Sequence, residues 1–421
     1  MVVPKRLLLP RLRAGALRIL GPLDIGAIRR SIEAVAERHE TLRTEIIDID
    51  GSPQQHVRAT VDLPRIVAVD DGSAADTEQN AARLANEFFG QKIDIMTHPL
   101  FAAMVLKLSD EHHMLLLSIE HIVGDGVSCG ILSRDVWSAY QQISSGAIIS
   151  FPEMPIQFGD FAVWQRRTSF ARRRKHEGYW MERMRGAPRV EIPTKANSGG
   201  SSHPTQKTIN LPFGKVLSDE LRRLARQEMT FLPIVVLAIY AIVMASLCDR
   251  VDFSMRFLSH RRHKRTELQH MIGNLAAGLF FRIEISPQES LLDVLRRAKQ
   301  EFVAATDHQD FLPPPTQESV PEVGFNWGGL VTYSARWSMY QQRNSVEALR
   351  LQPVNIRDEP GQKFKANFSD TPSGIVLTVS YRDDLLDSGR MEKIGRNLRV
   401  VGEQLVNHHS QRISTLRLLW K

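Results

Sequence analysis

The chain of 421 residues is long enough for two lobes of about 200 residues each, and its 43% hydrophobic and 24% charged residues are ordinary for a globular protein. Two cysteines, Cys129 and Cys248, exclude a disulfide framework and a cysteine-rich metal site, and they favour a reducing compartment. The net charge of +7 includes basic clusters at 172–175 and 261–265, which lack the interleaved aromatic residues of a nucleic-acid motif. We therefore expect a cytoplasmic protein whose basic clusters are a solvated helix face and a solvated loop. An acidic protein partner is the next interpretation, and nucleic acid is the last.

The first half of the chain alternates between predicted strands and helices. The expected elements are a strand over 16–20, a helix capped by Asp24 with apolar positions from Ile28 to Leu42, strands over 103–108 and 114–119 joined by a polar loop over 109–113, and a helix after Gly126. The second of the paired strands ends at the stretch Glu120-His121-Ile122-Val123-Gly124-Asp125-Gly126. Such a strand–loop–helix junction is a place where a rigid scaffold can present a reactive side chain.

The second half repeats the mixed pattern. The expected elements are two helical segments around Trp164 and Tyr179-Trp180, a linker over 193–206, a helix over 218–227 and a strand over 374–381. The apolar run 232–248, with Pro233 near its start, is shorter than the roughly 20 residues that a bilayer requires. We expect a buried core helix there, no membrane span, and an α/β fold in both halves.

The residue types of the 120–126 stretch are suited to acid–base chemistry. Gly124 and Gly126 can take backbone angles forbidden to other residues, which lets the chain turn sharply around His121. A neutral imidazole can accept a proton from an attacking amine or hydroxyl, typically worth about a hundred- to ten-thousand-fold in rate. Asp125 could orient His121, or it could fix the loop through an ion pair with a buried Arg. Taken alone, the pattern is more typical of a packed core histidine than of a catalyst.

Four companion segments occur in order with this stretch. They are Gly21-Pro22-Leu23-Asp24 with Arg38-His39-Glu40-Thr41-Leu42-Arg43-Thr44 (compare R-H-E-x-L-R-T), Phe158-Gly159-Asp160-Phe161-Ala162-Val163-Trp164-Gln165 (Y-x-D-Y-A-V-W-Q), Met271-Ile272-Gly273-Asn274 (M-I-G-x-F-V-N-T) and His308-Gln309-Asp310-Phe311 (H-Q-D-Y). The central stretch itself, with Ser128, is similar to H-H-x-x-x-D-G-x-S. Together they resemble the condensation domain of nonribosomal peptide synthetases, in the superfamily with the chloramphenicol-acetyltransferase fold.

The resemblance implies a fold and a set of roles. Two acetyltransferase-like lobes, 1–185 with the central stretch and 186–421 with a bridging loop near 271–282, would form a V-shaped pseudo-dimer. His121 would act as general base or positioning residue beside the donor thioester, with Gly126 close to the reacting centre. Asp125 would pair with Arg43 as a structural clamp, and Ser128 would support the motif.

Several positions depart from the family pattern or invite another interpretation. Glu120 replaces the first motif His, and we expect it to be half buried, to face away from the site of His121 and to play a structural part; the alternative is that it tunes or disables the site. The expected F-V-N-T gives way to 275–278, and the opening S-x-A-Q-x-R-L-W helix is missing. His112-His113 reads as a surface pair and not as a metal site, and Cys129 as a small core residue.

The expected activity is acyl transfer that forms an amide, or an ester when a hydroxyl attacks. Donor and acceptor would be thioesters on the phosphopantetheine arms of acidic acyl or peptidyl carrier proteins, with a small-molecule acceptor possible and no intrinsic cofactor or metal. One alternative is a coenzyme A-dependent acyltransferase, because residues 325–329 are weakly similar to the D-F-G-W-G motif of those enzymes. The other is a scaffold that binds carrier proteins without catalysis. With no adenylation region and no carrier motif outside the linker, we expect a free-standing enzyme or an excised domain.

Overall fold

The protein divides into two compact α/β units. The computed structural model describes residues 8–10, 12–60, 65–69, 74–96, 99–188, 190–195, 205–262, 265–310, 323–328 and 363–418. Within these residues, the first unit is drawn from Met1–Trp164 and His260–Ala276, and the second from Gln165–Ser259, Ala277–Thr332 and Arg357–Lys421. Two α/β lobes were the prediction, but their boundary differs from the one expected between 185 and 186. Residues 260–276, here called the strap, belong to the first unit although they connect two strands of the second.

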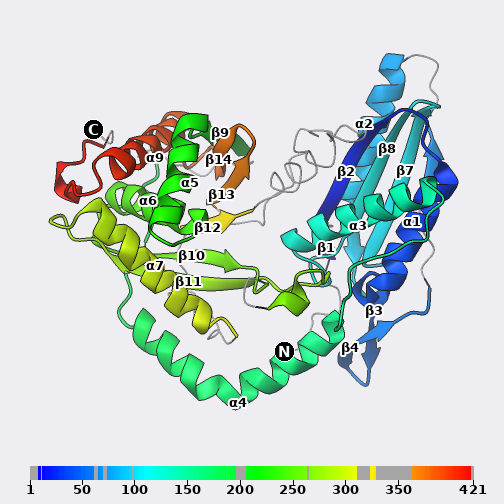
Figure 1. Cartoon of the computed structure of the whole chain (residues 1–421), viewed down its shortest axis with the longest axis horizontal. Helices are drawn as coiled ribbons and strands as arrows, with labels where there is room; N and C mark the ends of the chain where they lie inside the picture. Colours follow the sequence, from blue (N-terminus) through cyan, green and yellow to red (C-terminus); the bar gives the residue numbers. More distant parts are fainter. Residues whose placement is uncertain are drawn as a thin grey trace. The chain divides into compact units, whose positions relative to one another are not determined.

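The first unit is built on a four-stranded sheet of order β2-β8-β7-β5. Its elements are β1 (Leu8–Pro10), β2 (Leu12–Leu20), α1 (Ile25–Arg38), η1 (Glu40–Arg43), β3 (Thr44–Ile49), β4 (Ser52–Val57), β5 (Arg65–Ala68), α2 (Ala74–Gly90), β6 (Lys92–Asp94), β7 (Phe101–Ser109), β8 (His112–Ile119), α3 (Gly126–Ser144), the start of α4 (Phe158–Met184), and η2 (Thr266–Leu268) in the strap. Figure 1 shows α1 and α3 on one face of this sheet and α2 on the other.

Strand β8 lies between β2 and β7 in the interior of the sheet, and it is apolar on both faces. Leu115, Leu117 and Ile119 belong to the core cluster that includes residues of α1 and α3, whereas Met114 and Leu116 belong to the one that includes residues of α2. The predicted strands and the helix after Gly126 are confirmed. The polar loop was predicted too long, since the turn between β7 and β8 is confined to 110–111.

The helices of the first unit correct two further expectations. Asp24 caps α1 as predicted, accepting the N–H of Ala27 at 2.8 Å. The helix ends at Arg38 and not near Leu42, because His39 takes extended backbone and a short 3-10 turn follows. The two helical segments expected around Trp164 and Tyr179 are one helix, α4. The chain passes from the first unit to the second within α4, and 196–204 of the expected linker lie outside the described residues.

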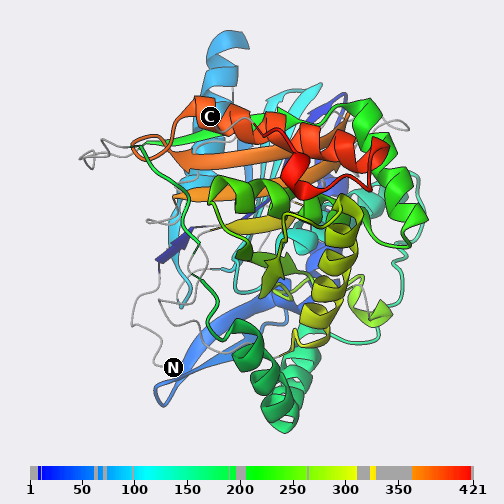
Figure 2. The same cartoon turned by 90° about the vertical axis from the view of Figure 1, so that its left-hand side faces the viewer.

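The second unit has a six-stranded sheet of order β11-β10-β12-β13-β14-β9. Its elements besides the rest of α4 are β9 (Gln206–Pro212), α5 (Lys215–Gln227), α6 (Leu232–Leu247), β10 (Asp252–Ser259), β11 (Ala277–Glu284), α7 (Leu291–Asp307), β12 (Gly324–Trp327), β13 (Phe364–Thr371), β14 (Gly374–Arg382), α9 (Ser388–Asn407) and η3 (Ile413–Thr415). Figures 1 and 2 show α5, α6, α7 and α9 gathered on one face of the sheet.

Helix α6 forms the centre of this second core. Its residues Ile234–Ala245 are all buried, with Pro233 in the first turn, so the predicted core helix is confirmed. In the described part of the chain, no single helix is long and apolar enough to cross a membrane. Helices α5 and α6 pass that test only as a pair, and they are bent by 110° relative to each other.

Candidate active site

His121 is the exposed residue at the end of a buried strand. Strand β8 ends at Ile119, and the next two residues differ sharply: Glu120 is fully buried, whereas His121 is exposed. The turn is held by hydrogen bonds from the N–H of Glu120 to the Leu100 carbonyl at 2.7 Å and from the N–H of Val123 to the Glu120 carbonyl at 3.0 Å. The imidazole is therefore exposed to solvent on a turn that these backbone hydrogen bonds hold in place.

Asp125 is the opposite case, a buried carboxylate with donors on both oxygens. It caps α3, and its Oδ1 accepts the N–H of Ser128 at 2.9 Å and lies 2.8 Å from the Ser128 hydroxyl. Its Oδ2 accepts Nη1–H of Arg262 at 2.8 Å and the N–H of Leu275 at 3.1 Å. A carboxylate offers about four lone-pair positions; these contacts fill three of them, and the fourth when the Ser128 hydroxyl donates to Asp125. Asp125 thus fixes the loop and does not orient His121.

The charge of Asp125 is stabilised by these neighbours. Burial by itself raises the pKa of the Asp125 carboxyl, but the adjacent Arg262 charge and the hydrogen bonds from Arg262 and Ser128 outweigh it. The net result is a pKa below the ordinary value of an aspartate. The carboxylate accordingly stays ionised and paired with Arg262 at neutral pH.

Asp125 pairs with Arg262 and not with Arg43, so the expected Asp125–Arg43 clamp is wrong. The Arg43 guanidinium donates instead to backbone carbonyls, those of Ala36 at 3.0 Å and Glu37 at 3.2 Å near the end of α1, and that of Arg58 after β4. Arg43 therefore joins the end of α1 to the β3–β4 hairpin. The buried Arg that the sequence required for Asp125 is Arg262.

Arg262 was expected on a solvated basic loop, and that expectation is wrong as well. Arg261 and Arg262 are only 8% and 6% exposed. Arg261 takes left-handed backbone, with φ of 57°, immediately before the residue that reaches Asp125. Arg262 Nη2 also donates to the carbonyls of Met271 at 3.1 Å and Gly273 at 3.3 Å, so one guanidinium joins both ends of the strap.

Ser128 ties the start of α3 to the strap. Its hydroxyl can donate its proton to Asp125 or to the Gly273 carbonyl at 3.0 Å, and it accepts the N–H of Gly273 at 3.1 Å. In the same segment, the Thr41 hydroxyl donates to the Ile272 carbonyl at 3.1 Å. Three of the sequence motifs thus meet at residues 271–275.

The second companion segment, residues 158–165, packs against the same point. Phe158 is the first residue of α4. A Cβ added to Gly273 would lie only 2.2 Å from the Phe158 ring. Glycine is therefore required at 273 for close approach. Gly124 has a similar reason, since a Cβ there would lie 2.1 Å from Cδ1 of Ile119. Neither Gly124 nor Gly126 has a positive φ, so the turn does not use the backbone angles that the two glycines were expected to allow. Gly126 is the first residue of α3.

A second buried polar cluster lies between α1 and α3. His39 Nε2 and Asp135 Oδ2 are 3.1 Å apart, and Arg38 and Arg134 flank the carboxylate. Burial lowers the pKa of His39, and its hydrogen bond to Asp135 only partly offsets this. The Arg-His pair of the first companion segment therefore joins the end of α1 to α3.

The remaining sequence candidates are structural. Cys129 is fully buried, and burial followed by the Asp125 charge raises the pKa of its thiol, so it is no nucleophile. His112 and His113 open β8, and His113 is 1% exposed, so the expected surface pair is wrong. Among the described residues, no group of His, Cys, Asp or Glu side chains could hold a metal ion.

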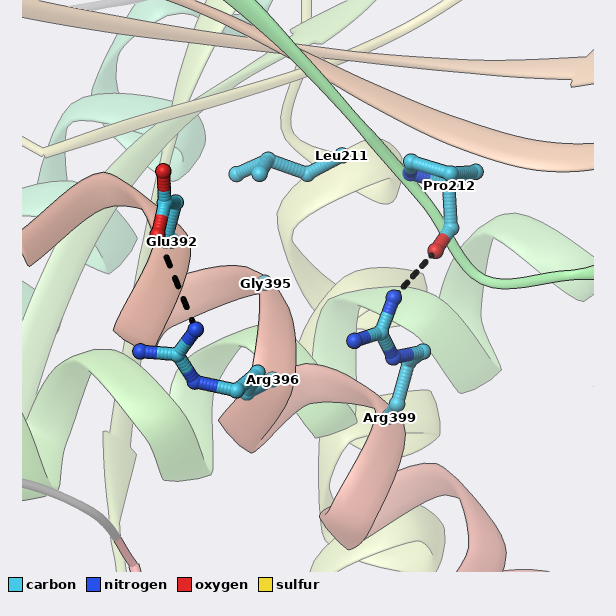
Figure 3. Close-up of a pocket in the computed structure, with 6 residues that line it drawn as sticks. All are labelled: Leu211, Pro212, Glu392, Gly395, Arg396 and Arg399. Atoms are coloured by element: carbon cyan, nitrogen blue, oxygen red, sulfur yellow. Dashed lines mark hydrogen bonds and ion pairs between the residues drawn. The ribbon is translucent and has the colours of Figure 1, made fainter. Parts of the chain in front are cut away.

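Two features of the second unit lie apart from these motifs. Phe325, in the segment 325–329 that is weakly similar to D-F-G-W-G, is buried and stacks on Phe368. It therefore belongs to the core. A pocket of about 210 Å³ between β9 and α9 is lined by Leu211, Pro212, Glu392, Gly395, Arg396 and Arg399 (Figure 3). A Cβ at Gly395 would lie 3.0 Å from Leu211, and no residue of the sequence motifs lines the pocket.

Comparison with known proteins places this geometry in one family. The family model described as Condensation domain matches residues 13–421. Phosphinothricin tripeptide synthetase PhsC of Streptomyces viridochromogenes is 31% identical over 96% of the chain, which spans 38% of that protein. Tyrocidine synthase 3 of Brevibacillus parabrevis is 26% identical over 93% of the chain, and only 6% of that protein is covered. The chain therefore spans a minor part of these relatives.

The fold has counterparts among solved structures. The epimerization domain from the third module of tyrocidine synthetase B matches with a TM-score of 0.74 at 17% identity, covering 95% of this chain and 93% of that one. At this level of identity the match supports the fold alone. It agrees with the predicted acetyltransferase-like lobes.

Proposed function

This chain belongs to the Condensation domain family, and we propose that it joins a carrier-bound acyl or aminoacyl thioester to an amine, with His121 acting on the attacking nitrogen. The observation that carries the proposal is the contrast within one turn. Asp125 is buried and holds the loop, whereas His121, four residues earlier, is exposed. A rigid loop with one accessible imidazole is what a positioned general base requires.

The proposed step is a single acyl transfer. The amine nitrogen attacks the thioester carbonyl carbon, the new C–N bond forms, and the C–S bond breaks to release the thiol. The His121 imidazole accepts the proton that the nitrogen loses, or holds the nitrogen while its charge develops, and the departing sulfur takes up a proton. A hydroxyl acceptor in the same position would give an ester.

The substrates and partners follow from the family. We propose that donor and acceptor arrive on phosphopantetheine arms of carrier proteins, with a small-molecule acceptor as a variant, and that the protein itself holds no cofactor. The net charge of +7 suits acidic carrier domains. The relative PhsC is named a tripeptide synthetase, which supports a peptide product. Neither Cys129 nor Cys248 forms a disulfide, which fits work in the cytoplasm.

Mass spectrometry of carrier proteins tests the proposal directly. A panel of carriers loaded with acyl and aminoacyl thioesters would be incubated with amine acceptors and the wild type, His121→Ala or His56→Ala. His56 is an exposed histidine of the same unit, paired with Glu45, and serves as the matched control. We expect a joined product and a freed carrier thiol with the wild type and His56→Ala, and neither with His121→Ala.

The other outcomes identify other functions. Equal product from His121→Ala would refute its role. Binding of carrier without turnover by the wild type would indicate the scaffold. Turnover of acyl-coenzyme A, but of no loaded carrier, would indicate the coenzyme A-dependent alternative. An inverted stereocentre without a joined product would indicate epimerisation.

A further inference from the structure

Two large apolar side chains are exposed on the turn between α5 and α6, and they are here called the corner patch. Met229 is 83% exposed and Phe231 is 71% exposed. Exposed apolar side chains are common on protein surfaces, so exposure alone assigns these two no role. What sets them apart is that each residue also conflicts with the backbone position that it occupies.

Met229 occupies the left-handed position at which α5 ends. Its φ is 47°, its N–H donates to the Arg226 carbonyl at 3.1 Å, and the N–H of Thr230 donates to the Ala225 carbonyl at 2.8 Å. This is the capping pattern in which glycine, or sometimes asparagine, takes the left-handed position. A Cβ makes that backbone unfavourable, so the stability of the turn favours Gly or Asn over Met.

Phe231 occupies the N-cap position of α6. Its backbone is extended, with φ of −97° and ψ of 145°, and its carbonyl accepts the N–H of Ile234 at 2.9 Å. Ser, Thr, Asp and Asn are preferred at an N-cap because the side-chain oxygen accepts an N–H of the first helical turn. The phenyl ring of Phe231 makes no such hydrogen bond. The helix would therefore be more stable with Ser at 231.

Core packing does not explain either residue. The apolar core of the second unit includes Ile234 and has Leu232 packed against it, but it does not include Met229 or Phe231. Backbone preference, capping and solvation thus favour other residue types at these two positions. Local rules of this kind are typically broken where a residue serves a function outside the fold. The corner patch is therefore suited to contact with another molecule.

The surroundings of the corner patch are basic and held in place. Arg296 Nε donates to Oε2 of Glu228 at 3.2 Å, and Lys299 Nζ donates to the Glu228 carbonyl at 3.1 Å, so α7 holds the turn. The exposed Arg226 precedes Met229 by three residues. These three cations outnumber the carboxylate of Glu228, so the rim of the patch is positive. A fixed turn also loses little conformational entropy when it binds.

The matching surface would combine an apolar pocket with acidic edges. Methionine and aromatic side chains are frequent anchors of protein interfaces, and rims of opposite charge guide association. A second copy of the chain would place two positive rims against each other, which opposes such a contact. Stable attachment to a lipid surface usually requires a longer amphipathic segment. An acidic protein partner is favoured over both.

We propose that the corner patch docks the acidic carrier domain. Met229 and Phe231 enter an apolar pocket of the carrier, while Arg226, Arg296 and Lys299 face its carboxylates. The identity of the partner rests on the proposed function. The conflict between the patch and local stability does not rest on it, so the inference has two independent tests.

Thermal unfolding tests the conflict with local stability. Met229→Asn and Phe231→Ser should each raise the midpoint of unfolding by about 2 °C, because each restores a residue that its backbone position prefers. Val216→Ser is the matched control, since Val216 is an apolar residue, 74% exposed, at the opposite end of α5. Its midpoint should stay within about 1 °C of the wild type. If neither patch variant rises, the two side chains support the fold and the inference is overturned.

Binding of carrier domains tests the docking. Apo carriers, which lack the phosphopantetheine arm, report contact with the carrier surface alone and would be measured by biolayer interferometry. The wild type and Val216→Ser should bind, and the double variant Met229→Asn/Phe231→Ser should bind at least about tenfold more weakly. Arg226→Gln should weaken binding about threefold at low salt and less at high salt.

Two binding results would overturn the docking. One is equal affinity in the double variant and the wild type. The other is a wild type that binds no carrier of the panel. Sedimentation with phosphatidylglycerol vesicles would be measured alongside, and vesicle binding that depends on the patch, without carrier binding, would identify a lipid contact instead.

Kinetics separate this inference from the proposed function. On loaded carriers, the double variant should raise KM for the carrier about tenfold and leave kcat unchanged. A wild type that forms no product, while apo carriers bind through the patch, would refute the proposed function and leave the docking standing. Product formation with the same KM in the double variant would overturn the docking and leave the proposed function standing.

Discussion

Arg262 donates from Nη1 to Oδ2 of Asp125 at 2.8 Å across 137 positions of sequence. Both side chains are buried, at 7% and 1% exposure. Removing one partner of such a pair leaves an uncompensated charge away from water, which typically costs about 3–5 kcal/mol. The pair is therefore central to the stability of the loop that carries His121.

Replacing Arg262 should destabilise the protein more than replacing Arg43. We expect Arg262→Gln to lower the free energy of unfolding by about 3 kcal/mol. Arg43→Gln removes hydrogen bonds to partly exposed carbonyls and should cost about 1 kcal/mol. Urea unfolding of both variants measures the difference, and equal losses would show that Arg262 is not the partner on which the loop depends.

A methyl group at Gly273 should disturb the contact with Phe158. The added Cβ would lie 2.2 Å from the ring, so Gly273→Ala should cost about 1–3 kcal/mol through overpacking. Phe158→Leu removes the clashing atoms, and the double variant should be more stable than the sum of the single losses predicts. A double-mutant cycle in urea provides the measurement, and simple additivity would exclude the contact.

Acid should lower the stability of the fold through the buried His39. The pKa of His39 is lowered in the fold, mainly by burial, so the unfolded chain takes up the proton first as the pH falls below about 6.5. Stability is consequently full above that pH and declines below it. His112, His113 and His270 contribute with the same sign, because burial lowers the pKa of each.

His39→Gln isolates the part played by this one residue. Glutamine can still donate a hydrogen bond to Asp135 but does not titrate. Denaturation midpoints measured between pH 7 and pH 5 should therefore fall less steeply in the variant than in the wild type. Identical slopes would mean that His39 does not titrate differently in the folded and unfolded states.

Cys129 should be inert in the folded protein. Burial raises the pKa of its thiol, so little thiolate is present to react at neutral pH. Alkylation of the native protein should label the partly exposed Cys248 first, and Cys129→Ala should retain the condensation activity. Rapid native labelling of Cys129, read by peptide mass spectrometry, would contradict the buried environment.

Local patterns predicted much of this fold correctly. Strands with apolar residues on both faces, such as β8, and helices with a clear cap or a uniform apolar run, such as α1 and α6, follow from spacing and residue type. The exposed His121 beside a buried Glu120 also agrees with the expected divergence of neighbouring side chains. Glu120 was expected to be half buried and is wholly buried.

Contacts between distant segments could not be predicted in the same way. Asp125 required an Arg, but nothing in the spacing distinguishes Arg43 from Arg262, and Arg262 lies in a basic run that is typical of solvated loops. Its place shortly before Met271-Ile272-Gly273 was the one available sign. Similarly, the boundary of the units falls inside the continuous helix α4, between Trp164 and Gln165, where no turn or linker residue marks it.

The most direct test of the account is the single-turnover rate of amide formation by His121→Ala on a loaded donor carrier, with and without added imidazole. We expect a rate about a hundred- to ten-thousand-fold below that of the wild type, partly restored by imidazole, and an unchanged circular dichroism spectrum. A rate equal to that of the wild type, in a variant with the same spectrum, would contradict catalysis by His121.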